Sequence, residues 1–322
     1  MPLALIELDF DPLLRLGSLT IRWQTIGVTL ALLVALSLAA LMAPDVRSQR
    51  PFFRRREPDL RPFFPHAPKV EHAKRVRALR LDDMLLIIAG IVPGAVVGGR
   101  LAHALDYWSY YSSQPDKVFD PLVGSLSLLG AVLGGLLTAS YVARMIDAPV
   151  RRWADAAAVP LLLAIGLGKL AQLLGGSGQG LPFDGSWAVA FTGSGPWVST
   201  NPAMPSHPAQ VYEGLWMLAG IPIVLLLAGR RFQPLRVNHF VGWADRTARE
   251  GALFAGALGW FLLGRLFVGY FWRDEPTVGP LNVEQALALM SLMAIVLAYG
   301  IVHLAADRRG LASQQGARGN SR

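Results

Sequence analysis

The sequence contains no cysteine, and this absence excludes several kinds of chemistry. No disulfide can join its segments, no thiolate can act as a nucleophile, and no metal site can use cysteine ligands. The His, Asp and Glu residues lack metal-ligand spacing, and there is no Gly-x-Ser-x-Gly elbow or phosphate-cradling glycine loop. We therefore expect neither a metal nor another cofactor.

Charged residues are scarce as well. They account for 16% of the 322 residues, whereas soluble domains contain about 25%. The hydrophobic fraction is 53% and the mean hydropathy is +0.40, values that are typical of membrane proteins. The segment Met1–Arg22 has acidic residues and no basic n-region, so we do not expect it to be a signal peptide.

Seven segments are apolar enough, and close enough to about 20 residues, to span a bilayer. They are about Trp23–Met42, Met84–Leu105, Val123–Met145, Ala154–Leu174, Gln210–Leu227, Gly251–Phe271 and Val283–Ala305. These spans predict an all-α integral membrane protein with seven transmembrane helices. We assign residues 1–305 to a single membrane domain and the polar residues 306–322 to a disordered cytoplasmic tail.

The Lys and Arg residues lie almost entirely in alternate loops. Of these 30 residues, 23 are in the first, third and fifth loops and the tail, and eleven of them are in residues 43–83. The positive-inside rule places these segments in the cytoplasm, with the N-terminus outside and the C-terminus inside. The loops therefore explain the net charge of +8, and we expect no nucleic-acid partner.

Two loops are long enough to have structure of their own. In the first loop, Val70–Leu81 predicts a short basic helix, which either lies on an anionic inner leaflet or belongs to a solvated linker. The longest outside loop, residues 175–206, is rich in Gly, Ser and Pro. A loop of this size is usually functional or forms a small cap, and we expect an extracytoplasmic cap here.

The fifth span opens with the string His-Pro-Ala-Gln-Val-Tyr-Glu, residues 207–213. Pro208 suits the first turn of a helix, where its missing N–H has no partner to lose. Four polar side chains stand at this helix start, with three of them on roughly one face: His207, Gln210, Tyr212 and Glu213. An ordinary helix start with interfacial aromatic residues has the same pattern, so both interpretations stay open at this point.

Three basic residues fall inside predicted spans: Arg100, Lys169 and Arg265. A charge inside the bilayer costs at least about 2.5–3.5 kcal/mol, so each needs a partner or a ligand. The predicted topology puts all three in the outer half of the membrane, level with residues 207–213. His103 and Asp106 follow Arg100 at one-turn intervals, which also fits an interfacial ion-pair cluster. Several cations at one depth suit an anionic lipid headgroup, because phosphate carries compact negative charge.

These features together resemble the prolipoprotein diacylglyceryl transferase family, from about Leu16 to Leu304. Besides residues 207–213, the matching strings are Gly168-Lys169-Leu170-Ala171-Gln172-Leu173-Leu174-Gly175-Gly176, Gly98-Gly99-Arg100, Gly134-Gly135 and Arg265. The resemblance implies a multi-pass enzyme of the bacterial plasma (inner) membrane that transfers diacylglyceryl from phosphatidylglycerol to the lipobox cysteine of a preprolipoprotein. Its implied partners are phosphatidylglycerol, the preprolipoprotein signal peptide and membrane lipid. The acceptor thiol belongs to the substrate, which agrees with an enzyme that has no cysteine.

The resemblance also implies roles for the polar residues of the outer half. Lys169 and Arg265 would hold the phosphate, and Arg265 would also act in catalysis. The other residues expected to bind the headgroup are Arg100, Gln172, Gln210, Tyr212 and Glu213. His207 or His103 would accept the proton of the thiol.

The sequence departs from the family pattern at several of these positions. Lys169 replaces an arginine, Gln172 and Gly175 replace asparagines, Ser177 and Gly269 replace glutamates, Leu133 replaces a histidine, and Gln24 replaces a tyrosine. Two hypotheses therefore stay open: an active transferase, or a relative that binds phospholipid or lipoprotein precursors without transfer. A transporter with an anion path is disfavoured, because the spans show no evident inverted repeat.

Overall fold

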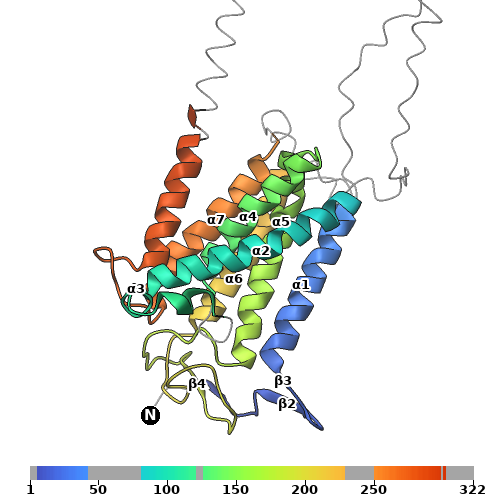
Figure 1. The fold of residues 1–322 in the computed structure, drawn as a ribbon. Helices are drawn as coiled ribbons and strands as arrows, with labels where there is room; N and C mark the ends of the chain where they lie inside the picture. The colour runs from blue at the N-terminus through green and yellow to red at the C-terminus, as the bar shows by residue number, and fades with distance from the viewer. Residues whose placement is uncertain (1–5, 43–80, 121–125, 229–249, 299, 302–322) are drawn as a thin grey trace, which may run out of the picture.

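The computed structural model describes residues 6–42, 81–120, 126–228, 250–298 and 300–301. Its main elements are long helices: α1 (Trp23–Met42), α2 (Leu81–Asp106), α4 (Leu128–Met145), α5 (Val150–Ala171), α6 (Ala209–Ala228), α7 (Ala252–Val268) and the helix Val283–Ala298. Figure 1 shows these helices gathered in a bundle, with the short strands at one end of it. The described residues are therefore mostly helical, as the sequence predicts.

Six of these helices are long and apolar enough to cross a membrane. They correspond to the first six predicted spans, so the chain has the character of a multi-pass membrane protein. The helix Val283–Ala298 begins where the seventh span was expected, but its described part is shorter than a full span. The predicted basic helix at Val70–Leu81 and the tail at 306–322 lie outside the described residues, apart from Leu81, which begins α2.

The third helix begins later than predicted. The sequence suggested a start at Val123, whereas α4 begins at Leu128, after Ser127. The Ser127 side chain accepts a hydrogen bond from the Gly130 N–H at 3.2 Å, which is the ordinary way for a serine to cap a helix. The apolar character of residues 123–127 extended the predicted span, because hydropathy alone does not recognise a capping serine.

Helices α2 and α4 pack closely along glycines that are spaced by four residues in the sequence, a pattern that predicts tight helix contact in lipid. A Cβ atom added to Gly134 would lie 2.9 Å from the Cα of Gly98, and one added to Gly98 would lie 2.9 Å from the Cα of Gly134. Any side chain at either position would force the two helices apart. The four-residue spacing of these glycines therefore marks the contact between α2 and α4.

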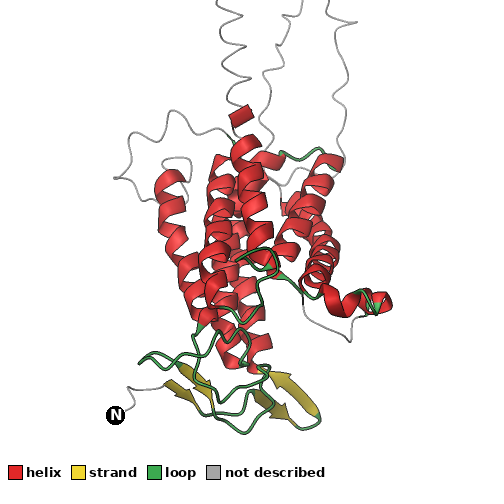
Figure 2. Ribbon diagram, turned by 90° about the vertical axis from the view of Figure 1, so that its left-hand side faces the viewer, coloured by secondary structure: helices red, strands yellow, loops and turns green. Residues whose placement is uncertain are grey.

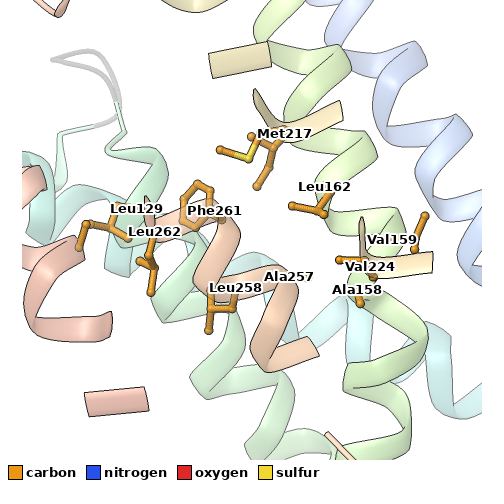
Figure 3. Packing of buried hydrophobic residues seen from close by; sticks show 12 residues of the cluster. Leu129, Ala158, Val159, Leu162, Met217, Val224, Ala257, Leu258, Phe261 and Leu262 are labelled. Atoms are coloured by element: carbon orange, nitrogen blue, oxygen red, sulfur yellow. The ribbon is translucent and has the colours of Figure 1, made fainter. Parts of the chain in front are cut away.

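The apolar core lies where α5, α6 and α7 meet. Figure 3 shows Leu162 of α5, Met217 of α6 and Phe261 of α7 in this core, and each is fully buried. At its edge, Trp216 and Trp260 stack with ring centroids 4.6 Å apart. Each indole N–H donates to the main-chain carbonyl of the other tryptophan, at 2.9 and 2.7 Å. This reciprocal pair joins α6 to α7 without leaving a polar group unpaired.

Four short strands lie at the end of the bundle where α1 begins (Figure 2). Strand β1 (Ile6–Leu8) pairs in parallel with β4 (Val189–Phe191), and β2 (Leu13–Leu16) pairs antiparallel with β3 (Leu19–Arg22). The sequence reading did not include these strands. Each is only three or four residues long, and the β1–β4 pair joins segments far apart in the chain, so period-2 alternation had too few residues to be visible.

The loop at 175–206 folds back on this small sheet. The Gln179 amide donates to the carbonyl oxygens of Pro202 and Met204, at 3.2 and 2.8 Å. The backbone of Val189 is bonded to that of Ser206 in both directions, at 3.0 and 3.2 Å. These bonds give a segment without long regular elements a defined shape next to the start of α6.

Candidate functional site

The Glu213 carboxylate of α6 is the centre of a buried charged cluster. Its side chain is completely buried, and Lys169 Nζ of α5 lies 2.9 Å from its Oε2 atom. Arg265 of α7 donates from Nη1 to both carboxylate oxygens, each at 2.9 Å. Charges away from water need a partner of opposite sign, and here one carboxylate serves two cations. The predicted convergence of Lys169 and Arg265 with the residues at 207–213 is therefore present at Glu213.

Arg265 has a second carboxylate partner, which the sequence reading missed. Its Nη2 atom contacts Glu284, which lies in the first turn of the helix Val283–Ala298. The Ser127 hydroxyl donates to the Oε1 atom of Glu284 at 2.5 Å. The cluster thus contains two cations and two carboxylates, all buried, and connects four helices of the bundle.

Trp272 lies against both cations of the cluster. Its ring centroid is 4.6 Å from Lys169 Nζ and 5.9 Å from Arg265 Cζ, within the range of a cation–π interaction. Behind the indole, Gly178 has a φ of +77°, and a Cβ atom there would lie 2.8 Å from Trp272 Cη2. The next residue, Arg273, donates to the Gly180 carbonyl at 2.7 Å and so fixes this loop to the cap segment.

Several buried polar atoms around the cluster have no hydrogen-bond partner within the described part of the chain: both side-chain atoms of the Gln210 amide, Oε1 of Gln172, Nε of Arg265 and Nε1 of Trp272. Gln172 and Trp272 both face Gly178, and Gln210 donates from its main-chain N–H to the Gly178 carbonyl at 3.3 Å. An unpaired buried polar group costs about 1–3 kcal/mol. Donors and acceptors gathered beside two cations are characteristic of a site that binds a polar ligand.

The Asp274 carboxyl lies close enough to interact electrostatically with Lys169 and Arg265 of the cluster and with His103 of α2. Burial raises the pKa of the Asp274 carboxyl, and the positive charges of Arg265 and Lys169, together with His103 when it is protonated, oppose that rise. His103 lies beside the rings of Tyr107 and Tyr111, with centroids 4.7 and 5.9 Å away.

Two other predicted residues of α2 lie near His103. Asp106, one turn further along the helix, interacts electrostatically with both Asp274 and Arg265. Arg100, one turn before His103, donates from Nη2 to the main-chain carbonyl of Asp120. The contacts of Arg100 thus include the loop after α2, whereas His103 and Asp106 interact with Asp274.

His207 and Tyr212 belong to a separate aromatic group at the cap. His207 Nδ1 lies 3.1 Å from the Tyr212 hydroxyl, which also accepts a 2.7 Å hydrogen bond from Trp187. The imidazole stacks on Phe183 with centroids 4.0 Å apart. Burial lowers the pKa of His207, so its neutral form is favoured. The predicted polar face is therefore divided: Gln210 and Glu213 are fully buried, and His207 lies among aromatic rings.

Three positions that depart from the family pattern contact one another. The Ser177 hydroxyl donates to Gln24 Oε1 at 2.5 Å. A Cβ atom on Gly175 would lie 2.9 Å from Gln24 Cβ, so the glycine makes room for the glutamine. Leu133, a fourth such position, is partly buried and packs against the apolar core. Gln24, Gly175 and Ser177 thus form one group of mutually compatible side chains.

Comparison with known proteins gives a consistent result. A family model described as prolipoprotein diacylglyceryl transferase matches residues 67–302. A relative from Geobacter sulfurreducens is 29% identical over 231 residues, covering 70% of this chain and 80% of the relative. One from Trichormus variabilis is 25% identical, covering 91% and 89%. Another, from Symbiobacterium thermophilum, is 26% identical, covering 89% and 91%. All three are named phosphatidylglycerol–prolipoprotein diacylglyceryl transferase.

Proposed function

The chain belongs to the prolipoprotein diacylglyceryl transferase family, and on this basis we propose that it transfers diacylglyceryl from phosphatidylglycerol to the lipobox cysteine of a prolipoprotein. The observation that carries the proposal is the meeting of Lys169 and Arg265 at the buried Glu213. Two cations at one point within a membrane bundle suit a phosphate group that enters with a lipid.

The reaction defines what the site must supply. The thiol sulfur forms a bond to the glyceryl carbon, and the bond from that carbon to the phosphate oxygen breaks. The thiol proton passes to a base, and glycerol phosphate leaves with the electron pair of the broken bond. Negative charge therefore accumulates on the departing phosphate, where fixed cations lower the barrier.

Lys169 and Arg265 are the proposed phosphate ligands. Glu213 accepts a hydrogen bond from each, so it fixes their relative positions while leaving other N–H groups available. For Lys169 these are the remaining ammonium N–H groups, and for Arg265 the buried Nε–H. Lysine binds phosphate as a point charge, without the bidentate geometry of the arginine that it replaces.

The neighbouring unpaired groups are the proposed ligands of the headgroup oxygens. Gln210, Gln172 and the Trp272 indole N–H supply both donors and acceptors beside the cations. Glu213 acts on the cations and not directly on the phosphate. For Tyr212, the hydrogen bond from Trp187 favours a role in shaping the cap. For Arg100, the bond to the Asp120 carbonyl favours a role in holding that loop.

His103 is the proposed base for the thiol proton. The Asp274 carboxyl interacts electrostatically with His103 and also with the two phosphate ligands Lys169 and Arg265, so His103 belongs to the same charged site. His207 is the less suitable candidate, because its Nδ1 atom is engaged with Tyr212 and its ring is stacked on Phe183. We assign His207 to the framework of the cap.

The site also fits a topology in which it faces the outer half of a bacterial plasma membrane. Six apolar helices, the shorter apolar helix Val283–Ala298 and the basic loops are consistent with the proposed seven spans, with the N-terminus outside and residues 43–83 in the cytoplasm. In this arrangement residues 1–305 form one membrane domain, the segment 175–206 is an extracytoplasmic cap, and residues 306–322 are a cytoplasmic tail.

A transfer assay tests the proposal. Purified protein in detergent is given phosphatidylglycerol and a lipobox peptide, and the diacylglyceryl thioether is measured by mass spectrometry. We expect product with phosphatidylglycerol and none with phosphatidylethanolamine or with the Cys→Ser peptide. Folded protein that binds phosphatidylglycerol but forms no thioether would instead support the alternative of a relative that binds lipid without transfer.

A further inference from the structure

Glu284 is a buried carboxylate to which the proposed transfer chemistry gives no role. Its exposed fraction is 7%, and it contacts the same guanidinium group that Glu213 holds from the other side. Ser127 donates to its other oxygen at 2.5 Å. Arg265 is therefore held between two carboxylates from different helices, of which only Glu213 also serves Lys169.

The sequence around Glu284 fixes this carboxylate at Arg265. Asn282 and Gln285 form a capping box, in which each main-chain N–H donates to the side-chain oxygen of the other, at 3.0 and 2.8 Å. The Gln285 amide also donates to the carbonyl of Leu266, the residue after Arg265, at 2.9 Å. The first turn of the helix is thus bonded directly to α7.

A glycine on α7 completes this attachment. A Cβ atom on Gly269 would lie 2.6 Å from Gln285 Cγ, so the absence of a side chain lets the helix start approach α7. Gly269 is one turn beyond Arg265, on the side where the capping box packs. Glu284 is therefore held by local structure as well as by the attraction of opposite charges.

The charge balance of the cluster affects how strongly it binds the lipid substrate and the phosphate product. Lys169 and Arg265 form ion pairs with Glu213 and Glu284, so these four charges cancel one another. Phosphatidylglycerol carries one negative charge, and glycerol phosphate carries up to two after the bond breaks. Cations without balancing anions would bind the product more strongly than the substrate, because attraction grows with ligand charge.

We propose that Glu284 is a positioning residue that orients Arg265 and, by balancing its charge, keeps the site from retaining the glycerol phosphate product. This inference rests on the proposed transfer reaction, since it concerns the product of that reaction at the same cluster. Glu284 itself touches no reacting atom. It acts through the guanidinium group that it holds.

The isosteric variant Glu284→Gln separates charge from shape. A glutamine oxygen can accept from Arg265, and its amide can donate to the Ser127 hydroxyl, so every contact has a replacement. Competition by sn-glycerol phosphate and the KM for phosphatidylglycerol are measured in the transfer assay. We expect the inhibition constant for glycerol phosphate to fall by roughly tenfold and the KM by a smaller factor, because the ligands carry different charges. The maximal rate falls because product leaves more slowly.

Two control variants make the result specific. Glu275→Gln removes an exposed carboxylate from the loop after α7 and should leave both constants unchanged. Glu284→Asp keeps the charge but shortens the side chain, so the inhibition constant should stay near that of the parent while the rate falls. An unchanged or raised inhibition constant in Glu284→Gln would overturn the proposal.

Direct binding of glycerol phosphate, measured by calorimetry on both proteins, keeps the two hypotheses distinct. Tighter binding by Glu284→Gln supports the role of Glu284 even if the parent protein forms no thioether, an outcome that would overturn only the transfer function. Equal binding by the two proteins, with transfer intact, overturns only the role of Glu284. Failure of both proteins to bind glycerol phosphate overturns this proposal, whatever the outcome for transfer.

Discussion

Lys169 Nζ lies 2.9 Å from Glu213 Oε2 inside a helix bundle, and both side chains are buried. The pair joins α5 to α6, and Arg265 extends it to α7 through the same carboxylate. A buried carboxylate shared by two cations is difficult to replace, because removing it leaves both cations without their common partner.

Replacing Glu213 by glutamine should affect activity and stability together. The variant keeps the shape of the side chain but removes the carboxylate that Lys169 and Arg265 share. We expect transfer to fall by about 100-fold, because the two phosphate-binding cations lose the partner that positions them, an effect comparable to the loss of one donor to a developing negative charge. Breaking a buried ion pair also lowers the free energy of unfolding by about 3–5 kcal/mol. Specific activity and thermal unfolding in detergent measure the two effects.

Glu7→Gln is the matched control for Glu213→Gln. Glu7 is exposed on β1, so the same chemical change there should alter neither activity nor the unfolding temperature. Glu213→Gln protein with the activity of the parent would show that the shared carboxylate does not organise the cations.

Placing an arginine at position 169 should raise the affinity for phosphate. Arginine presents a planar set of donors that matches two phosphate oxygens, whereas lysine acts as a point charge. We expect Lys169→Arg to retain transfer and to lower the KM for phosphatidylglycerol by about threefold, in line with a stronger charge-assisted hydrogen bond. Lys169→Ala should raise the KM and reduce the rate. Steady-state kinetics with lipid in mixed micelles give both constants.

A loss of transfer in Lys169→Arg would indicate that packing, and not only charge, matters at this position. Trp272 lies 4.6 Å from Lys169 Nζ, and Gly178 closes the space behind the indole. If the larger guanidinium displaced Trp272, transfer would fall although the positive charge is kept. Such a loss would show that packing at Trp272 requires lysine at this position, contrary to our expectation.

The sequence was sufficient to predict part of the cluster, for a clear physical reason. Charges at Lys169 and Arg265 stand out within apolar spans, and the topology puts them at one depth with Glu213. Glu284 and Trp272 did not stand out. A carboxylate in the first turn of a helix and a tryptophan at a membrane interface both have ordinary explanations. Only the three-dimensional structure shows that these two side chains contact Arg265.

The bundle was predictable to a similar extent. Long apolar segments locate the six helices α1, α2, α4, α5, α6 and α7 within a few residues, because a bilayer demands length and hydrophobicity. The pairing of Ile6 with Val189 depends on residues that are distant in sequence, and nothing local identifies one as the partner of the other. The pairing of β1 with β4 is therefore visible in the structure but not in the sequence.

The tryptophan pair between α6 and α7 should stabilise the bundle cooperatively. Trp216 and Trp260 exchange hydrogen bonds with each other's main-chain carbonyls, so each single replacement leaves one bond intact. We expect Trp216→Phe and Trp260→Phe each to lower the free energy of unfolding by about 1–2 kcal/mol, because each variant loses one partly buried hydrogen bond. Because the rings also stack, the double variant should differ from the sum. Unfolding in denaturant tests this, and strict additivity would contradict it.

The absence of cysteine allows a direct test of the proposed orientation. Single cysteines can be introduced without removing any other thiol and labelled with a maleimide that does not cross membranes. Ser18, in the turn between β2 and β3, and Arg151, at the start of α5, are both exposed and lie at opposite ends of the helices. We expect Ser18→Cys to be labelled on intact spheroplasts and Arg151→Cys only after the membrane is opened, because basic loops stay in the cytoplasm. Labelling of Arg151→Cys on intact spheroplasts would reverse the topology and put the Glu213 cluster in the inner half of the membrane, away from the outer leaflet that the proposed function requires.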